Sequence, residues 1–175
     1  EAGGIKMEQL QTSAILMTAS HRVVGRIGTV GQRLSDILNN KLNTCLKVYS
    51  AEIFRHTDTD IPLARFPAIT MPKATIDLVL LNEGVHEAPT KRLYGYVQKD
   101  VYPTFLTVSG FEVRGGIHFT TPQKPDIFLT DTITTFVPVT QATVVSSSAP
   151  HCSWSVPVVF VPRASIMIFY LDAPT

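Results

Sequence analysis

Short runs of apolar, often β-branched residues follow one another along the chain, with polar turns between them. Residues 15–29, rich in Ile, Val and Thr, predict two short strands or one long bent strand. Residues 44–54, 66–71 and 75–81 predict further strands, and Pro72 is expected at a bend or an edge because proline cannot donate a ladder hydrogen bond. Several short strands within about 70 residues favour a small barrel or sandwich, since a lone sheet would leave its apolar edges open.

The hydrophobic pattern occurs twice, at a spacing of 90 positions. Identical residues coincide in three clusters, mostly at the alternating positions that strands require. The pairs are Leu16/Leu106, Val23/Val113, Gly25/Gly115, Ile27/Ile117, Asp36/Asp126, Ile37/Ile127, Pro72/Pro162, Ala74/Ala164, Ile76/Ile166 and Leu81/Leu171. Lys73 matches Arg163 conservatively, and a one-residue slip aligns residues 50–53 with 141–144.

The duplication predicts an all-β protein of two tandem, homologous, small β-barrel-like units, each with one short helical turn. An N-terminal arm covers residues 1–13 and the first repeat covers 14–83. A linker at 84–103 contains an added strand at 91–99 (KRLYGYVQK), and the second repeat covers 104–175.

The helical turn is predicted at RLSDILNN, where Leu34, Ile37 and Leu38 fall on one helical face. Ser35 or Asp36 is expected to cap its first turn, and Asn39 and Asn40 to end it. The second repeat has PDIFL here, with a proline suited to the first helical position and Asp126 matching Asp36. We interpret the turn as a structural plug that closes a barrel; an active site that uses the carboxylate and the amides is the alternative. The residues assigned to this structural turn are Leu34, Ser35, Asp36, Leu38, Asn39 and Asp126.

These motifs resemble those of an uncharacterised bacterial family of small tandem β-domains. The shared pattern is G-x-I at Gly25, RLSDxLN from Arg33, A-x-I at Ala51 and P-K/R-A-x-I at Pro72 and Pro162. The diverged second copy reads FEVRGGIH from Phe111 and FVPVTQA from Phe136. The chain departs from the family at Pro72 and Pro162, where an Asn is expected. The resemblance covers nearly the whole chain and implies no activity.

A weaker similarity, at the level of the fold, is to Sm-like barrels. It is carried by Gly25, Ile27, Asp36, Asn40 and Leu46. The spacing from the glycine to the aspartate is longer than in that pattern, and the second repeat has no Asn there. The similarity therefore concerns the fold and is not evidence of RNA binding.

Composition and charge narrow the choice of function. Hydrophobic residues make up 45% of the chain and charged residues 17%, with a net charge of +1, which excludes a strong global attraction to nucleic acid but not a local patch. Residues 21–47 hold five cations against the single carboxylate of Asp36, whereas residues 111–137 hold two against three carboxylates. The candidate contacts for an anion or a partner are Arg22, Arg26, Arg33, Lys41 and Lys47.

No targeting signal is visible, and prolines interrupt the most apolar stretch, 156–171, which is too short to span a membrane. We therefore expect a cytoplasmic protein without a membrane span, in which Cys45 and Cys152 are free thiols; a disulfide is the alternative. Asp58 and Asp60 are too few for a cation site.

No phosphate loop, dinucleotide fingerprint or paired-cysteine metal motif occurs, and no cofactor is expected. Adjacent His151 and Cys152 would point to opposite faces of a strand, so they do not predict a catalytic dyad. We expect a non-enzymatic interaction or scaffold protein that self-assembles or docks with other protein subunits. The alternative is a module that binds nucleic acid or an anionic ligand through the basic residues of the first repeat.

Overall fold

The computed structural model describes residues 11–56, 61–82, 99–120, 122, 124–131 and 133–174. Among these residues strands dominate, with two short α-helices and two 3-10 turns. The elements are β1 (Gln11–Met17), β2 (His21–Gly28), α1 (Leu34–Asn39), β3 (Cys45–Arg55), β4 (Ala64–Pro72), η2 (Lys73–Thr75), β5 (Leu78–Leu81), β6 (Asp100–Val108), β7 (Phe111–Phe119), α2 (Pro125–Thr130), β8 (Phe136–Ser146), β9 (Ser153–Pro162), η3 (Arg163–Ser165) and β10 (Ile166–Leu171). The all-β class and a short helix at each predicted turn are confirmed.

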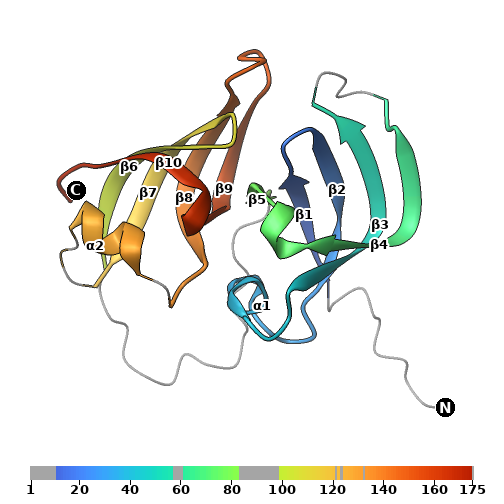
Figure 1. Cartoon of the computed structure of the whole chain (residues 1–175), viewed down its shortest axis with the longest axis horizontal. Coiled ribbons are helices and arrows are strands. Elements are labelled where there is room, and N and C mark those ends of the chain that lie inside the picture. Colours follow the sequence, from blue (N-terminus) through green and yellow to red (C-terminus); the bar gives the residue numbers. More distant parts are fainter. Residues whose placement is uncertain are drawn as a thin grey trace.

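The same sequence of elements occurs twice along the chain. We call β1 to β5 with α1 the first unit, and β6 to β10 with α2 the second unit. Each unit has its fifth strand beside its first, followed by strands two, three and four. The two units lie side by side and join through β5 and β9, near the centre of the molecule (Figure 1).

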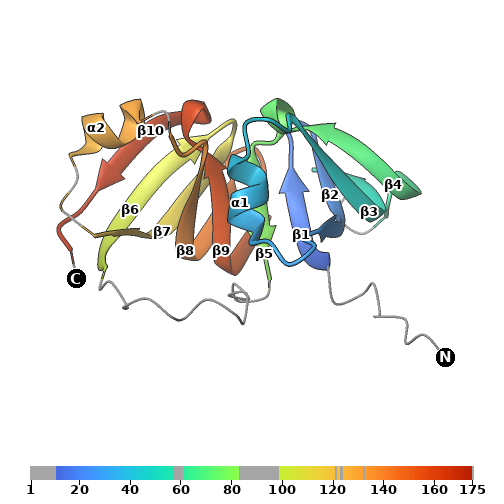
Figure 2. The same cartoon turned by 90° about the horizontal axis from the view of Figure 1, so that it is seen from below.

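The prediction of barrels is wrong in one respect, because the strands do not close on themselves. All ten described strands form one open antiparallel sheet, in the order β10-β6-β7-β8-β9-β5-β1-β2-β3-β4. Closing the first unit would require β4 to pair with β5. That edge of β5 is instead occupied by β9 of the second unit. The sheet therefore runs on from one unit into the next, and α1 lies close to the place where they meet (Figure 2).

The third strand of each unit contains a bulge at the same place. Ser50 and Gln141 both have positive φ, 49° and 48°, and the pairing register shifts beside each of them. These residues lie at the one-residue slip in the sequence repeat. The second strand bends closely over the bulge, because a Cβ added at Gly25 or Gly115 would lie 2.9 or 2.7 Å from a backbone oxygen of the third strand. Glycine is required for that approach.

Pro72 and Pro162 lie at the last positions of β4 and β9, as their predicted place at bends or edges requires. Residues 91–98 of the strand expected at 91–99 lie outside the described residues, as do the carboxylates Asp58 and Asp60. In the part of the chain that is described, no helix is long and apolar enough to cross a membrane.

Candidate functional site

The joint between the two units is a short antiparallel ladder in which every residue of β5 is buried. Val79 pairs with Phe160, Leu80 with Val159 and Leu81 with Val158. We call this ladder and the side chains around it the internal junction.

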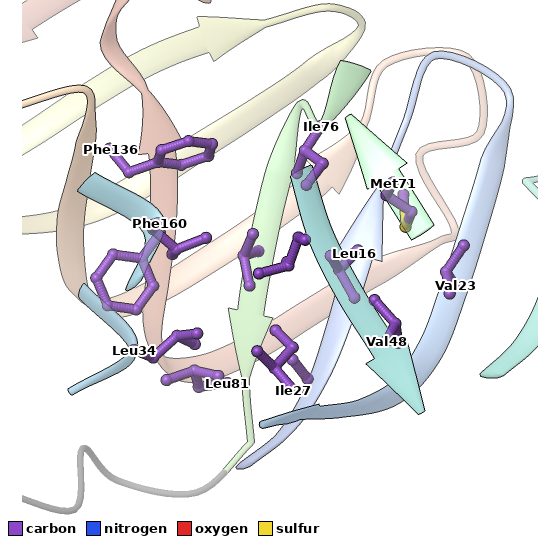
Figure 3. Packing of buried hydrophobic residues seen from close by; sticks show 14 of the residues in the cluster. Leu16, Val23, Ile27, Leu34, Val48, Met71, Ile76, Leu81, Phe136 and Phe160 are labelled. Carbon is purple, nitrogen blue, oxygen red and sulfur yellow. The ribbon is translucent and has the colours of Figure 1, made fainter. Parts of the chain in front are cut away.

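Each unit completes the hydrophobic core of the other across the internal junction. The first core includes three side chains of the second unit, which are Phe136, Val158 and Phe160. The second core includes three side chains of the first unit, which are Met17, Leu78 and Leu80. Figure 3 shows Phe136 at one side of the first core and Val23 at the other. Because both cores extend across the joint, neither unit buries its apolar surface alone.

Asn39 at the end of α1 ties the two units together through its amide. Its Oδ1 accepts hydrogen bonds from the backbone N–H groups of Thr135 (2.7 Å) and Phe136 (2.8 Å). Its Nδ2 donates to Phe136 O (3.2 Å) and to Ser35 O (2.9 Å) within the helix. The sequence identified Asn39 as a turn residue, but its contact with a backbone 97 positions away could not be deduced from local pattern.

The expected side-chain caps of the helices are wrong. Arg33 is the N-cap residue of α1 and Lys124 that of α2, and neither makes a side-chain capping bond. Asp36 and Asp126 lie within the first helical turn instead, where a carboxylate suits the positive end of the helix. The helices are held from their other ends.

A basic residue at the start of each 3-10 turn binds carbonyl groups near the end of the short helix. Lys73 Nζ donates to Ile37 O (2.5 Å) and Asn40 O (3.0 Å), and burial lowers the pKa of its ammonium, against an opposing effect of Cys45. Arg163 occupies the matching position, where Nη1 donates to Asp131 O (3.0 Å) and pairs with Asp131 Oδ2 (2.7 Å). These two buried cations therefore fix the position of the helices.

Asp131 is held in its ionised form by several neighbours. The backbone N–H of Ile133, which donates to its carboxylate (2.8 Å), is the largest influence that lowers the pKa of Asp131, followed by the Arg163 side chain. Lys41 of the first unit also lowers this pKa. Lys41, one of the predicted anion contacts, thus lies in the field of a carboxylate of the second unit.

A second group of contacts between the two units involves Asp77 and His56 of the first unit. The rings of His56 and Phe111 meet edge to face with centroids 5.4 Å apart, and His56 Nε2 contacts Thr18 O at 2.7 Å. Asp77, just before β5, hydrogen-bonds Ser109 in the turn between β6 and β7. Burial raises the pKa of Asp77, while Ser109 and His56 oppose that shift.

Among the described strands, β4 in the first unit and β10 in the second each have one open edge. Large apolar side chains are exposed mainly on β10, where Met167, Ile168 and Tyr170 are 74%, 58% and 56% exposed. On β4 the exposed large apolar side chain is Phe66, which is 46% exposed. Natural sheets normally avoid an exposed apolar edge such as β10 unless a partner covers it.

The predicted basic cluster is divided by the fold. Arg22 and Arg26 share the outer face of β2, and Arg22 lies over the Phe54 ring, 4.5 Å from its centroid. Lys47 lies 5.2 Å from the centroid of Tyr49, which is paired directly with Arg26 across β2 and β3. The other two predicted contacts, Arg33 and Lys41, flank α1 and do not belong to this face.

A hollow of about 620 Å³ lies beside α2 and β7. Its lining is mainly apolar, and Arg163, its buried cation, is already bound to Asp131. The described residues contain no group of three His, Cys, Asp or Glu side chains that would hold a metal ion. Cys45 and Cys152 are both free and half-buried.

Comparison of the chain with protein-family models, with curated proteins and with solved structures finds no match.

Proposed function

We propose that this protein is a scaffold subunit, built from a duplicated five-stranded unit, that assembles into a larger structure through the open edges of its sheet. The observation that carries the proposal is that β4 and β10 each have an edge with no pairing strand among the described residues, with exposed apolar side chains on β10 and at Phe66 of β4. An edge strand presents unpaired N–H and C=O groups, and a second strand that adds there satisfies both these groups and the apolar side chains.

The polar residues that attracted attention in the sequence support a structural role. Asn39 joins the units, and Lys73 and Arg163 hold the short helices through backbone carbonyls. These hydrogen bonds hold the fold together, so we assign the three residues no catalytic task. The proposed partners are copies of this chain or other protein subunits.

The proposal is tested by the molar mass in solution, from light scattering after gel filtration, over a range of protein concentrations and at low and high salt. We expect masses that are multiples of 19.2 kDa and that rise with concentration. Salt should weaken them little, because apolar contacts dominate the edges. A mass of 19.2 kDa under every condition would overturn the proposal.

A matched pair of variants locates the contact. Tyr170→Lys places a charge on the open edge of β10 and should reduce the assembly to a folded monomer. Thr143→Lys places the same charge on an exposed position of β8, a strand inside the sheet, and should leave the assembly intact. Equal masses for the two variants would contradict an assembly through the edges.

A second candidate function is the binding of a polyanion on the outer face of β2 and β3. Arg26, Tyr49 and Lys47 support it, because an aromatic ring between two cations suits a nucleic acid. The test is the binding of a labelled single-stranded oligonucleotide, followed by fluorescence anisotropy. Binding should weaken steeply with salt and be lost when Arg22 and Arg26 are replaced by Glu. Binding that these replacements leave unchanged would exclude this face.

A further inference from the structure

The internal junction shows how two units of this kind fit together, and the same two types of strand are left open at the ends of the sheet. β9 and β4 are the fourth strands of their units, and β5 and β10 are the fifth. Within the chain a fourth strand pairs with a fifth strand, β9 with β5. We infer that β4 of one copy pairs with β10 of a second copy in the same antiparallel register. This inference rests on the proposed self-assembly.

The inferred contact joins the β4 edge of one copy to the β10 edge of another. A contact of this kind is heterologous, because different surfaces of the two copies meet. Each chain that adds leaves one β4 edge and one β10 edge free. The assembly therefore grows from head to tail, and it closes as a ring if the rotation between successive units allows it.

The register of the new ladder follows from that of the internal junction. Matching pairs across the two units show that β4 corresponds to β9, and β5 to β10, with a shift of 90 positions. The pairs Val79–Phe160, Leu80–Val159 and Leu81–Val158 then become Phe169–Thr70, Tyr170–Ile69 and Leu171–Ala68 of the second copy.

The backbone hydrogen bonds support this register independently. Asp172 N donates to Pro103 O, next to the β10–β6 ladder. Because bonding to one neighbour alternates along an antiparallel strand, the N–H and C=O groups of Phe169 and Leu171 point to the open edge. Phe169 and Leu171 are the first and the third of the β10 residues in the inferred pairs. In an antiparallel ladder every second pair exchanges backbone hydrogen bonds, so these two residues can bond to the new strand.

The same argument applies to β4. Lys73 N donates to Thr44 O at the end of the β3–β4 ladder, so the backbone groups of Thr70 and Ala68 point away from β3. In the inferred register Thr70 faces Phe169 and Ala68 faces Leu171. Both open edges therefore present their free backbone groups to each other at the positions required.

The side chains of β10 also match the role of β5. Leu78 and Leu80 are fully buried against the second core, and the matching residues of β10 are Ile168 and Tyr170, both more than half exposed. In the inferred assembly these two side chains pack against the core of the next copy's first unit. Ile69, opposite Tyr170, already packs against that core.

The experiment uses two variants that each block one edge. Thr70→Pro removes the outward N–H of β4, and Leu171→Pro removes that of β10; proline is tolerated at such outward positions of edge strands. Each variant alone has only one working type of edge and should be a monomer of 19.2 kDa. A mixture of the two should form a dimer and nothing larger, because one β10 meets one β4. Thr70→Ser keeps the N–H and should assemble like the wild type.

The outcomes separate this inference from the proposed function. A dimer formed by either proline variant alone would show that an edge pairs with itself and would overturn the inference. A mixture that stays monomeric, while the wild type assembles, would overturn the β4–β10 pairing and leave the scaffold proposal standing. Urea unfolding of each variant establishes that the monomers are folded.

A cross-link tests the register directly. Ile69→Cys and Tyr170→Cys, each in a chain with Cys45 and Cys152 replaced by Ser, should form a covalent dimer on mild oxidation. In the inferred ladder Ile69 and Tyr170 form a non-hydrogen-bonded pair, whose Cα atoms lie about 4.5 Å apart, within the range that a disulfide bridges. Ile69→Cys mixed with Met167→Cys is the control and should not cross-link. Equal yields from both mixtures would contradict the register.

Discussion

β5 and β10 occupy the same place in their units, yet one lies in the middle of the sheet and the other at its edge. Leu78 and Leu80 of β5 are covered by β9 and the second core, whereas Ile168 and Tyr170 of β10 face solvent. The sequence of elements that builds the two units is the same. Whether the fifth strand of a unit lies in a core or at an edge therefore depends on whether a neighbouring unit covers it.

The two joints also differ in chemistry. At the internal junction β9 offers Val158 and Phe160, while the open β4 offers Ala68 and Thr70 at the matching positions. Less apolar area is then available to a second copy than to the second unit of the same chain. We expect a permanent joint inside the chain and a reversible joint between chains.

The largest expected effect comes from placing a charge at matching positions of the two fifth strands. Leu80→Asp buries a carboxylate in the internal junction and should cost more than about 4 kcal/mol, enough to unfold most of the chain. Tyr170→Asp should change the free energy of unfolding by less than about 1 kcal/mol and abolish assembly instead. Urea unfolding and light scattering measure the two effects. If both variants unfold, β10 is part of a core and not an open edge.

A smaller loss is expected when the amide that ties the units together is removed. Asn39→Ala leaves the N–H groups of Thr135 and Phe136 without their partner and should lower the free energy of unfolding by about 2 kcal/mol. Asn40→Ala is the matched control, because the side chain of Asn40 accepts a hydrogen bond from the exposed N–H of Leu42, and the change should cost under about 1 kcal/mol. Urea unfolding compares them; equal losses would mean that Asn39 does not stabilise the junction.

The sequence predicts local features well and the connection between units poorly. Alternating apolar residues and the repeat at 90 positions predicted the strands and both short helices, because these depend on neighbours along the chain. The same pattern led to the wrong prediction of two closed barrels. It shows which residues are buried, but it does not show which strand buries them. Val158 and Phe160 of the second unit belong to the first core, and no local signal marks that exchange.

The candidate site shows the same limit. Asn39 and Lys73 were noticed as a turn residue and a repeat match, but their partners lie far away in the sequence. The sequence held one signal for the role of Asn39. The second unit has no equivalent amide, although the apolar residues around it repeat. The position that matches it, judged by the buried residues Leu38 and Phe128, is Leu129.

This difference suggests a variant that strengthens the weaker joint. Leu129→Asn restores an amide on α2, where it would face Thr44 and Cys45 of the next copy as Asn39 faces Thr135 and Phe136. We expect tighter assembly by up to about tenfold, the equivalent of roughly one hydrogen bond. Sedimentation over a dilution series measures it, with Leu129→Ala as the control that removes the leucine without adding an amide. Equal affinities for these two variants would contradict the proposed docking of α2.

The smallest effect concerns pH at the internal junction, where Asp77 precedes β5. Burial raises the pKa of this carboxyl above its ordinary value of 3.8, so the folded chain keeps the proton at pH values where the unfolded chain has lost it. The contribution of Asp77 to stability therefore falls as pH rises from below 3.8 through the raised pKa. Asp77→Asn keeps a neutral side chain beside Ser109 and should not show this fall. Urea unfolding between pH 3.5 and 7 measures the free energy of unfolding of the wild type and of the variant. We expect the variant to gain stability relative to the wild type as pH rises. A relative loss would mean that His56 and Ser109 outweigh burial and hold Asp77 in its ionised form.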